Sequence, residues 1–77
     1  MHYQTGLWHK FLAVSKKAKV FEVCVQGSVV YWRLGMQGTK CATRKIQNDT
    51  EQHAEKVMYE MIDKKLAEGF VYQHSAM

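Results

Sequence analysis

Four side chains within one short stretch have the chemistry to bind a polyanion. Tyr31 and Arg33 stand two residues apart, and Lys40 and Arg44 follow within the next eleven positions. Basic side chains neutralise phosphates, and an exposed aromatic ring can stack on a base or a sugar. The same residue types are also common on the solvated face of an ordinary β-sheet. Residue types alone leave these two interpretations about equally supported.

Catalytic and metal-binding arrangements are not indicated. The histidines and cysteines are widely separated and form no CxxC pair: His2, His9, Cys24, Cys41, His53 and His74. The spacing of these histidines and cysteines is not that of a zinc site. The sequence contains no nucleophile-and-base arrangement, paired-carboxylate motif or P-loop, and the turn from Gly35 to Gly38 is too short to cradle a phosphate. We therefore expect a non-enzymatic protein with no cofactor, no metal and no small-molecule substrate.

Length and charge point to one small domain with an uneven distribution of charge. The 77 residues are enough for a single domain, 1–77, and the net charge is +4. Residues 50–68 hold five acidic side chains against three lysines, whereas the rest of the chain holds eight basic side chains against two acidic ones. No apolar run approaches the ~20 residues of a membrane span, and no secretory signal is present. The sequence predicts a cytoplasmic protein with reduced cysteines and no membrane contact.

The clearest structural pattern is an amphipathic helix in the second half of the chain. Its apolar residues recur at helical spacing: Ala54, Val57, Met58, Met61, Ile62 and Leu66. Asn48, Asp49 and Thr50 are candidate N-caps, with Gln52 as the capping-box partner of Asp49. Gly69 is the expected stop, and Phe70 behind it can fold back onto the apolar stripe.

Four segments rich in β-branched and aromatic residues precede this helix. They are Leu7–Ser15, Val20–Val25, Ser28–Leu34 and Thr39–Ile46, with turns expected at Lys16-Lys17, Gln26-Gly27 and Gly35–Gly38. The pattern predicts an α+β fold, an antiparallel β-sheet of about four strands with one main C-terminal amphipathic helix packed on one face. Residues 7–72 form the expected ordered core, and 1–6 and 73–77 are expected to be loose termini.

The expected turns also assign side chains to the two faces of the sheet. A two-residue turn at Gln26-Gly27 would pair Phe21 with Trp32, and a four-residue turn at Gly35–Gly38 would pair Trp32 with Cys41. The helix-facing side then holds Phe21, Val23, Val25, Val30, Trp32, Leu34 and Cys41. The opposite side holds Tyr31, Arg33, Lys40, Ala42 and Arg44. Ile46 does not fit this alternation, which predicts a bulge or a strand end before it.

Trp32 is therefore expected in the core, although it is next to the candidate binding residues. Its replacement by Ala should then cost roughly 3 to 5 kcal/mol of stability. Tyr31 and Arg33 point to the other face and are the stronger candidates for binding.

Three segments together resemble the WGR domain, a module named for a Trp-Gly-Arg motif. They are "KVFEVCVQG", "YWRLGMQG" and "AEKVMYEMIDKKLAEGF", and the resemblance covers about Leu7 to Tyr72. Val20–Val23 match the family's aromatic strand, Arg33–Gly38 match its Arg-hydrophobic-Gly-x-x-Gly turn, and Lys64–Phe70 match the end of its helix. WGR domains occur beside the catalytic part of poly(ADP-ribose) polymerases. They also occur in bacterial proteins, including relatives of a putative molybdate-metabolism regulator.

The naming motif itself is altered, because this chain has Tyr31-Trp32-Arg33 where the family has Trp-Gly-Arg. In the polymerases the tryptophan and arginine help to hold a DNA end and to join neighbouring domains. The resemblance therefore implies a DNA-binding or interdomain role for Arg33, and for Tyr31 as a smaller aromatic residue in the tryptophan position.

We expect a non-catalytic nucleic-acid-binding module that uses Tyr31, Arg33, Lys40 and Arg44, with DNA favoured over RNA and with weak sequence preference. The alternative is a protein-interaction or interdomain regulatory module whose exposed sheet face docks a protein partner.

Overall fold

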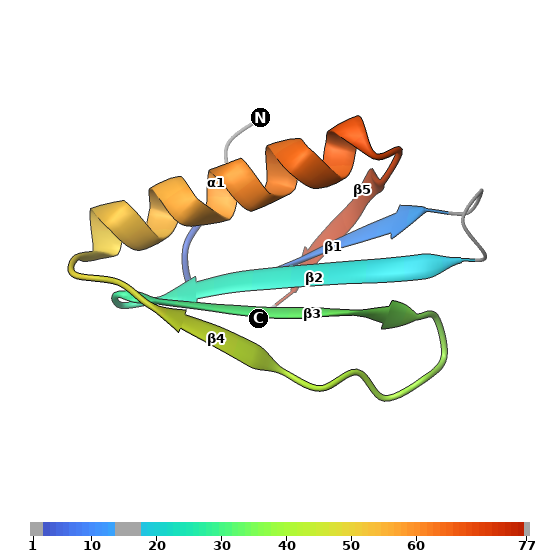
Figure 1. Cartoon of the computed structure of the whole chain (residues 1–77), viewed down its shortest axis with the longest axis horizontal. Helices are drawn as coiled ribbons and strands as arrows, with labels where there is room; N and C mark the ends of the chain where they lie inside the picture. Colours follow the sequence, from blue (N-terminus) through green and yellow to red (C-terminus); the bar gives the residue numbers. More distant parts are fainter. Residues whose placement is uncertain (1–2, 14–17, 77) are drawn as a thin grey trace.

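The computed structural model describes residues 3–13 and 18–76, which form a five-stranded antiparallel sheet and one helix. The elements are β1 (Trp8–Ala13), β2 (Lys19–Gln26), β3 (Val29–Met36), β4 (Arg44–Gln47), α1 (Glu51–Ala67) and β5 (Val71–Ala76). The strand order is β4-β3-β2-β1-β5, so α1 carries the chain from one edge of the sheet to the other (Figure 1). The predicted α+β class is confirmed, with β5 added to the expected strands.

The ends of α1 follow local sequence signals. Thr50 is the N-cap, and its side chain accepts a hydrogen bond of 3.1 Å from the backbone N–H of His53. This replaces the capping box that the sequence suggested for Asp49 and Gln52, because the helix begins one residue later. At the other end Gly69 has φ of +104°, a backbone conformation that favours glycine, and Phe70 folds back into the core as expected.

One face of the sheet and one stripe of the helix form the core. The fully buried side chains include Phe11 of β1, the alternating residues Phe21, Val23 and Val25 of β2, Val30 of β3, and Ala54, Met58 and Ile62 of α1. These side chains share a face because successive residues of a strand point to opposite sides of a sheet. Trp32, Val57 and Met61 are only partly buried against this cluster.

The turn between β2 and β3 is displaced from its predicted place without changing the faces. Val25 pairs with Val30, Val23 with Trp32 and Phe21 with Leu34, so the turn is at Gly27-Ser28 instead of Gln26-Gly27. Each predicted partner has moved by two positions. Because side chains alternate with a period of two, the predicted helix-facing set of β2 and β3 is retained.

The predicted register of β3 with β4 is wrong by three residues. Trp32 pairs with Arg44 instead of Cys41, and Tyr31 pairs with Lys45 instead of Ala42. The strand expected at Thr39–Ile46 is reduced to Arg44–Gln47, and the preceding residues form an irregular segment after β3. An odd displacement exchanges the faces, which explains why Ile46 did not fit the predicted alternation: it lies across from Val30 on the helix-facing side.

The predicted loose termini also need correction. The backbone N–H of Tyr3 donates a 2.8 Å hydrogen bond to the Tyr59 hydroxyl, and the Tyr3 ring packs edge-on against Tyr59 and Tyr72. Residues 73–76 continue β5 along β1. These contacts could not be expected from local sequence, because they join segments more than fifty residues apart.

Some expectations fall on Met1, His2, Met77 and the segment 14–17, which includes the predicted turn at Lys16-Lys17 and the end of the first predicted strand; these lie outside the described residues. Within the described chain, no helix has both the length and the apolar character needed to cross a membrane.

Phe21 and Trp32, two aromatic residues of the helix-facing side, should differ in their contribution to stability. We expect Phe21→Ala to cost about 3 to 5 kcal/mol, because the side chain is fully buried. Trp32→Ala should cost about 2 kcal/mol, less than its predicted value, because only part of the indole is withdrawn from water. Urea unfolding of both variants measures the difference, and an equal loss in the two would contradict it.

Candidate nucleic-acid interface

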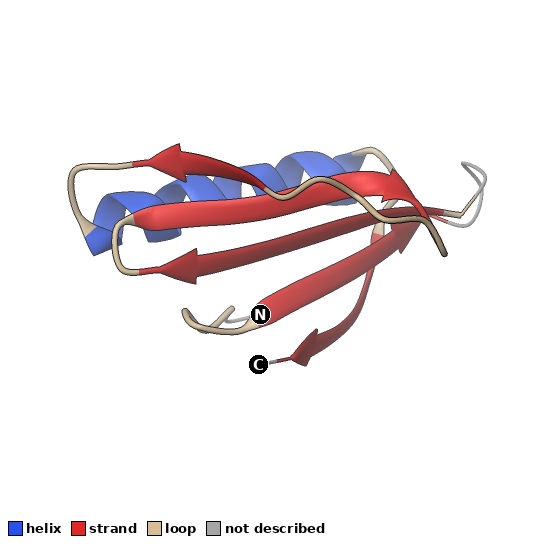
Figure 2. Cartoon of the chain, turned by 90° about the horizontal axis from the view of Figure 1, so that it is seen from below, coloured by secondary structure: helices blue, strands red, loops and turns tan. Residues whose placement is uncertain are grey.

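The face of the sheet opposite α1 is covered by no helix of the described chain. Figure 2 looks onto this face, with the helix behind the strands. The alternation of strand residues places Trp8 and Lys10 of β1, Glu22 and Cys24 of β2, Tyr31 and Arg33 of β3, and Lys45 of β4 on it. We call this surface the open face.

Two aromatic rings lie in one row across the open face. Tyr31 pairs with Cys24 on one side and with Lys45 on the other, and the register of β1 with β2 continues so that Trp8 lies beside Cys24. Both rings are partly exposed, whereas Cys24 between them is fully buried. Strands are spaced about 4.8 Å apart, so the backbone positions of Trp8 and Tyr31 are two strand spacings, or roughly 10 Å, from each other.

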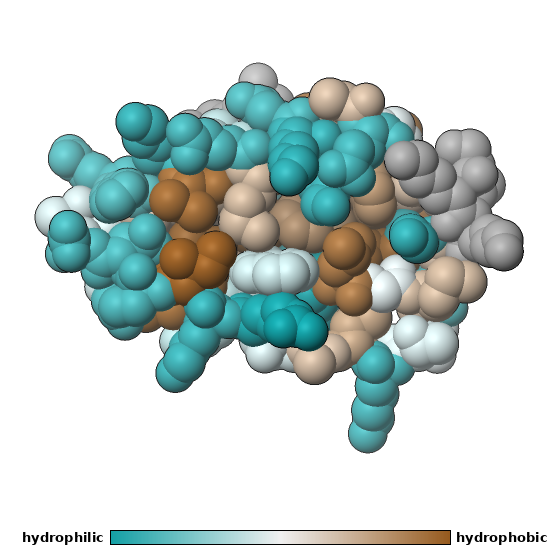
Figure 3. Space-filling model, in the orientation of Figure 1, coloured by the Kyte–Doolittle hydropathy of each residue, from teal (hydrophilic) through white to brown (hydrophobic). Residues whose placement is uncertain are grey.

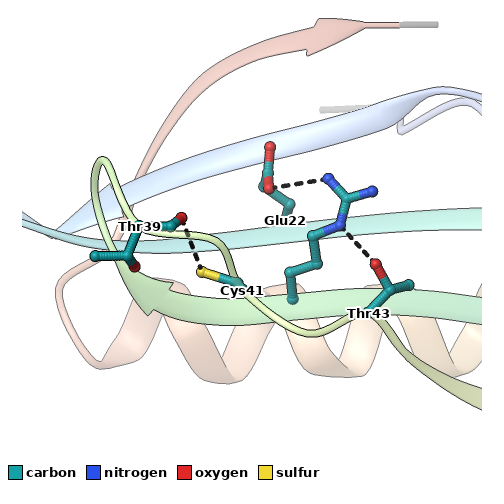
Figure 4. Close-up of polar contacts among 5 residues, drawn as sticks. Glu22, Thr39, Cys41 and Thr43 are labelled. Carbon is teal, nitrogen blue, oxygen red and sulfur yellow. Dashed lines mark hydrogen bonds and ion pairs between the residues drawn. The ribbon is translucent and has the colours of Figure 1, made fainter.

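Arg33 is held in place by three neighbours. Its Nε donates a 2.9 Å hydrogen bond to the Thr43 hydroxyl, and its Nη1 lies 3.5 Å from a carboxylate oxygen of Glu22, as shown by the dashed lines that end on these residues in Figure 4. Its guanidinium carbon also lies 4.1 Å from the centre of the Trp8 ring, within the range of a cation–π contact. The Arg33 side chain nevertheless remains 36% exposed, so part of the guanidinium is available to a ligand.

A pocket of about 420 Å³ lies beside Arg33, between the strands and the irregular segment that follows β3. Its lining includes three cations, Lys10, Arg33 and Lys40, together with the hydroxyl-bearing residues Thr39 and Thr43. Glu22 is the acidic residue in this lining. Cations and hydroxyl donors around a solvent-open pocket are suited to phosphate oxygens.

Close packing at Gly35 shapes the wall of this pocket. A Cβ atom at Gly35 would lie 2.5 Å from Sγ of Cys41, so the segment after β3 folds back against the strand at the one position without a side chain. Cys41 therefore lines the pocket and does not belong to the helix-facing core, where the predicted register had placed it. The sequence marked Gly35 as a turn residue, whereas the structure uses it for close approach.

The four predicted site residues are divided by the structure. Tyr31 and Arg33 share the open face, and Lys40 lines the pocket next to Arg33. Arg44 does not join them: it pairs with Trp32 on the helix-facing side, and its guanidinium carbon lies 5.8 Å from the centre of the Trp32 ring. The error follows directly from the three-residue displacement of β4.

Three residues of the open face were missed from the sequence. Lys45 takes the position across from Tyr31 that the predicted register gave to Ala42. Trp8 and Lys10 alternate with the core residues His9 and Phe11, and this alternation was the available signal. The alternation alone could not place Trp8 or Lys10 near Arg33, because the pairing of β1 with β2 depends on a turn whose geometry the sequence did not fix.

The open face and the pocket beside Arg33 are together electropositive within the region that the structure describes. The cations Lys10, Arg33, Lys40 and Lys45 stand against the single carboxylate of Glu22. Across residues 3–13 and 18–76, no three His, Cys, Asp or Glu side chains gather closely enough to hold a metal ion.

The pKa of the Cys24 thiol is changed by its position between Trp8 and Tyr31 on the open face. Burial raises the pKa of Cys24 above its ordinary value of 9.0, and the nearby Arg33 guanidinium offsets part of this rise. Both folded and unfolded chains keep the thiol protonated at neutral pH. As the pH rises above about 9, the unfolded chain loses its proton first.

We therefore expect Cys24 to lower the free energy of unfolding progressively as the pH is raised from 8 to 10.5. Urea unfolding of the wild type and of Cys24→Ala across this range measures the contribution, and the variant should show the shallower decline. Burial also raises the pKa of Tyr3, so some decline should remain in the variant. Identical slopes in the two proteins would contradict a buried protonated thiol.

The contact between Gly35 and Cys41 can be tested by a double-mutant cycle. Gly35→Ala alone should destabilise the domain by about 1 to 3 kcal/mol, because the new methyl group overlaps Sγ of Cys41. Adding Cys41→Ala removes the sulfur and should restore most of the loss, since the Cβ atoms would then be 3.6 Å apart. Thermal unfolding of the four proteins gives the coupling energy, and additive effects would contradict the close approach.

Comparison with known proteins provides no relative from which to transfer a role to these residues. No family model, no curated protein and no solved structure matches the chain. The open face is therefore interpreted from its own side chains and their geometry.

Proposed function

We propose that this chain is a non-catalytic nucleic-acid-binding module whose ligand lies on the open face. The observation that carries the proposal is the combination, on one sheet face that no described helix covers, of two partly exposed rings with three cations and one carboxylate, next to a fourth cation, Lys40, in the adjoining pocket. Single-stranded nucleic acids bind such surfaces through stacking on aromatic rings and through cations that follow the backbone. DNA is favoured over RNA by the family resemblance, and weak sequence preference is expected because these contacts reach phosphates and ring faces.

The contacts that hold the Arg33 side chain in place support a phosphate-binding role for it. An arginine that is stacked on Trp8 and bonded to Thr43 loses little further conformational freedom when it binds a phosphate. Its ion pair with Glu22 is partly exposed and 3.5 Å long, so exchange of this partner for a phosphate should cost little. Lys10 and Lys40 supply further positive charge in the adjoining pocket.

The resemblance to the WGR domain agrees with this use of the open face and is part of the proposal. The resemblance assigns the family's binding aromatic residue and arginine to Tyr31 and Arg33, which are two residues apart on the same face of β3. Trp32, in the family's glycine position, points to the other face, so the alteration leaves the open face clear. The two cysteines are free, which suits the reducing cytoplasm in which we place the protein.

A protein-interaction or interdomain role for the same face is the alternative. It would use the same rings as apolar anchors and would require a partner with a complementary acidic surface. Oligonucleotide binding separates the two roles.

The proposal is tested by fluorescence-anisotropy titration of a labelled single-stranded DNA and its duplex, at about 50 mM and 200 mM salt. We expect tighter binding at low salt, because each phosphate neutralised by a cation releases a counterion. The double variant Tyr31→Ala/Arg33→Ala should bind at least about tenfold more weakly, the combined loss of one stacked ring and one charged contact.

Two adjacent residues of β4 provide a matched control. Lys45→Gln should weaken binding and reduce the slope of log K against log salt by about one for the lost phosphate contact. Arg44→Gln removes the same charge from the helix-facing side and should leave binding nearly unchanged. No binding at low salt, or equal effects of the two substitutions, would refute a nucleic-acid site on the open face.

A further inference from the structure

A second surface lies on the other side of the sheet, where α1 does not reach the β4 edge. A groove of about 190 Å³ runs between the helix and β3, lined by Phe21, Trp32, Leu34, Met61, Lys64 and Lys65. Figure 3 shows hydrophobic residues, in brown and tan, exposed on the surface below the teal residues of α1. This α1–β3 groove shares no lining residue with the pocket of the open face.

The groove is apolar and only partly filled by the chain itself. Leu34, which lines the groove, is 39% exposed although it lies on the helix-facing side of the sheet, and Ile46, on the same side but outside the lining, is 37% exposed. Trp32 and Met61, which line the groove with Leu34, are partly buried against the core, so the apolar surface is continuous with the core. Clustered large apolar side chains at the edge of a core are typical of protein-binding sites, whereas scattered ones are not.

The described chain covers one flank of α1 and leaves the other flank exposed. On the β1–β5 side, Tyr3 packs against Tyr59 and covers the helix. On the β3–β4 side, β4 is the outermost strand, and all four of its residues are exposed. No described segment lies over the groove on this side, so a partner can reach both the groove and the strand edge.

Charge identifies the kind of partner. Lys64 and Lys65 line the groove, and the guanidinium of Arg44 lies over the Trp32 ring at its sheet side. Glu68 is the described carboxylate paired at this end of the helix, 3.5 Å from Lys65, which leaves Lys64 and Arg44 for a ligand. An apolar groove rimmed by cations is complementary to a segment that has apolar anchors and acidic neighbours.

We propose that the α1–β3 groove binds a short acidic peptide segment of a protein partner. One or two large apolar side chains of the segment fill the space beside Trp32 and Leu34, and its carboxylates pair with Lys64 and Arg44. This binding is separate from the proposed nucleic-acid site and does not depend on it.

The test begins with an unbiased selection of twelve-residue peptides from a random displayed library on the wild-type protein, with counter-selection on Leu34→Glu. Leu34 is already partly exposed, so this substitution adds a carboxylate to the groove without removing a core residue. We expect enriched peptides that combine Leu, Ile, Phe or Met with several Asp or Glu. No enrichment over the counter-selected variant, or enrichment without acidic bias, would overturn the proposal.

Selected peptides are then synthesised and titrated against variants with a single tryptophan. The chain has two tryptophans, so Trp8→Phe leaves Trp32 as the only one, and its emission should shift to shorter wavelength when a peptide fills the groove. Lys64→Glu should weaken binding at least about fivefold at low salt, the effect of reversing one partly exposed ion pair. Lys56→Glu, the same charge change on an exposed part of the helix outside the groove, should have little effect.

Independence from the first site is measured in the same assay. Tyr31→Ala/Arg33→Ala should bind the peptides as well as the wild type does, and Leu34→Glu should retain oligonucleotide binding. Equal weakening by Lys64→Glu and Lys56→Glu, or peptide binding to Trp8→Phe without a change in Trp32 emission, would place the peptides elsewhere and refute the groove.

Discussion

A single helix has to cover a five-stranded sheet, and this constraint organises the whole domain. The 17 residues of α1 make a rod about 25 Å long, which crosses the sheet and buries its stripe against β2 and β3. One helix cannot cover both faces, so the opposite face is left to solvent. It is also too narrow to cover one face completely, and within residues 3–13 and 18–76 the chain fills only one of its flanks, with Tyr3 and the rings around it.

The two uncovered surfaces differ in chemistry because they differ in their relation to the core. The open face is separated from the helix by the sheet itself, so charged and aromatic residues can alternate there with the core residues of the same strands. The α1–β3 groove is an incomplete part of the core, so its lining is mostly apolar, and Lys64 and Lys65 of α1 are the cations in it. Trp32 and Arg33, adjacent in sequence, contribute to different surfaces for this reason.

Strand register decides which residues predicted for one face of the sheet are found on that face in the structure. The β2–β3 turn is displaced so that partners move by two positions, and every helix-facing residue of those strands keeps its side. The β3–β4 connection moves partners by three, which exchanges Arg44 for Lys45 on the open face. In this connection the chain folds back on β3, where Cys41 closely approaches Gly35. The rules that relate turn length to register apply to short hairpins and do not cover such a connection.

The sequence by itself determined the α+β class, the helix and its Gly69 stop, the alternation of Phe21, Val23 and Val25, and the common face of Tyr31 and Arg33. These features depend on the periods of 3.6 and 2 residues and on local capping, which neighbours in sequence are sufficient to establish. Only the tertiary structure decided the burial of Tyr3, the fifth strand, the contact of Trp8 with Arg33 and the separation of Arg44 from the open face. Each of these depends on pairing between segments that are distant in sequence or joined by an irregular connection, and no local periodicity specifies such pairing.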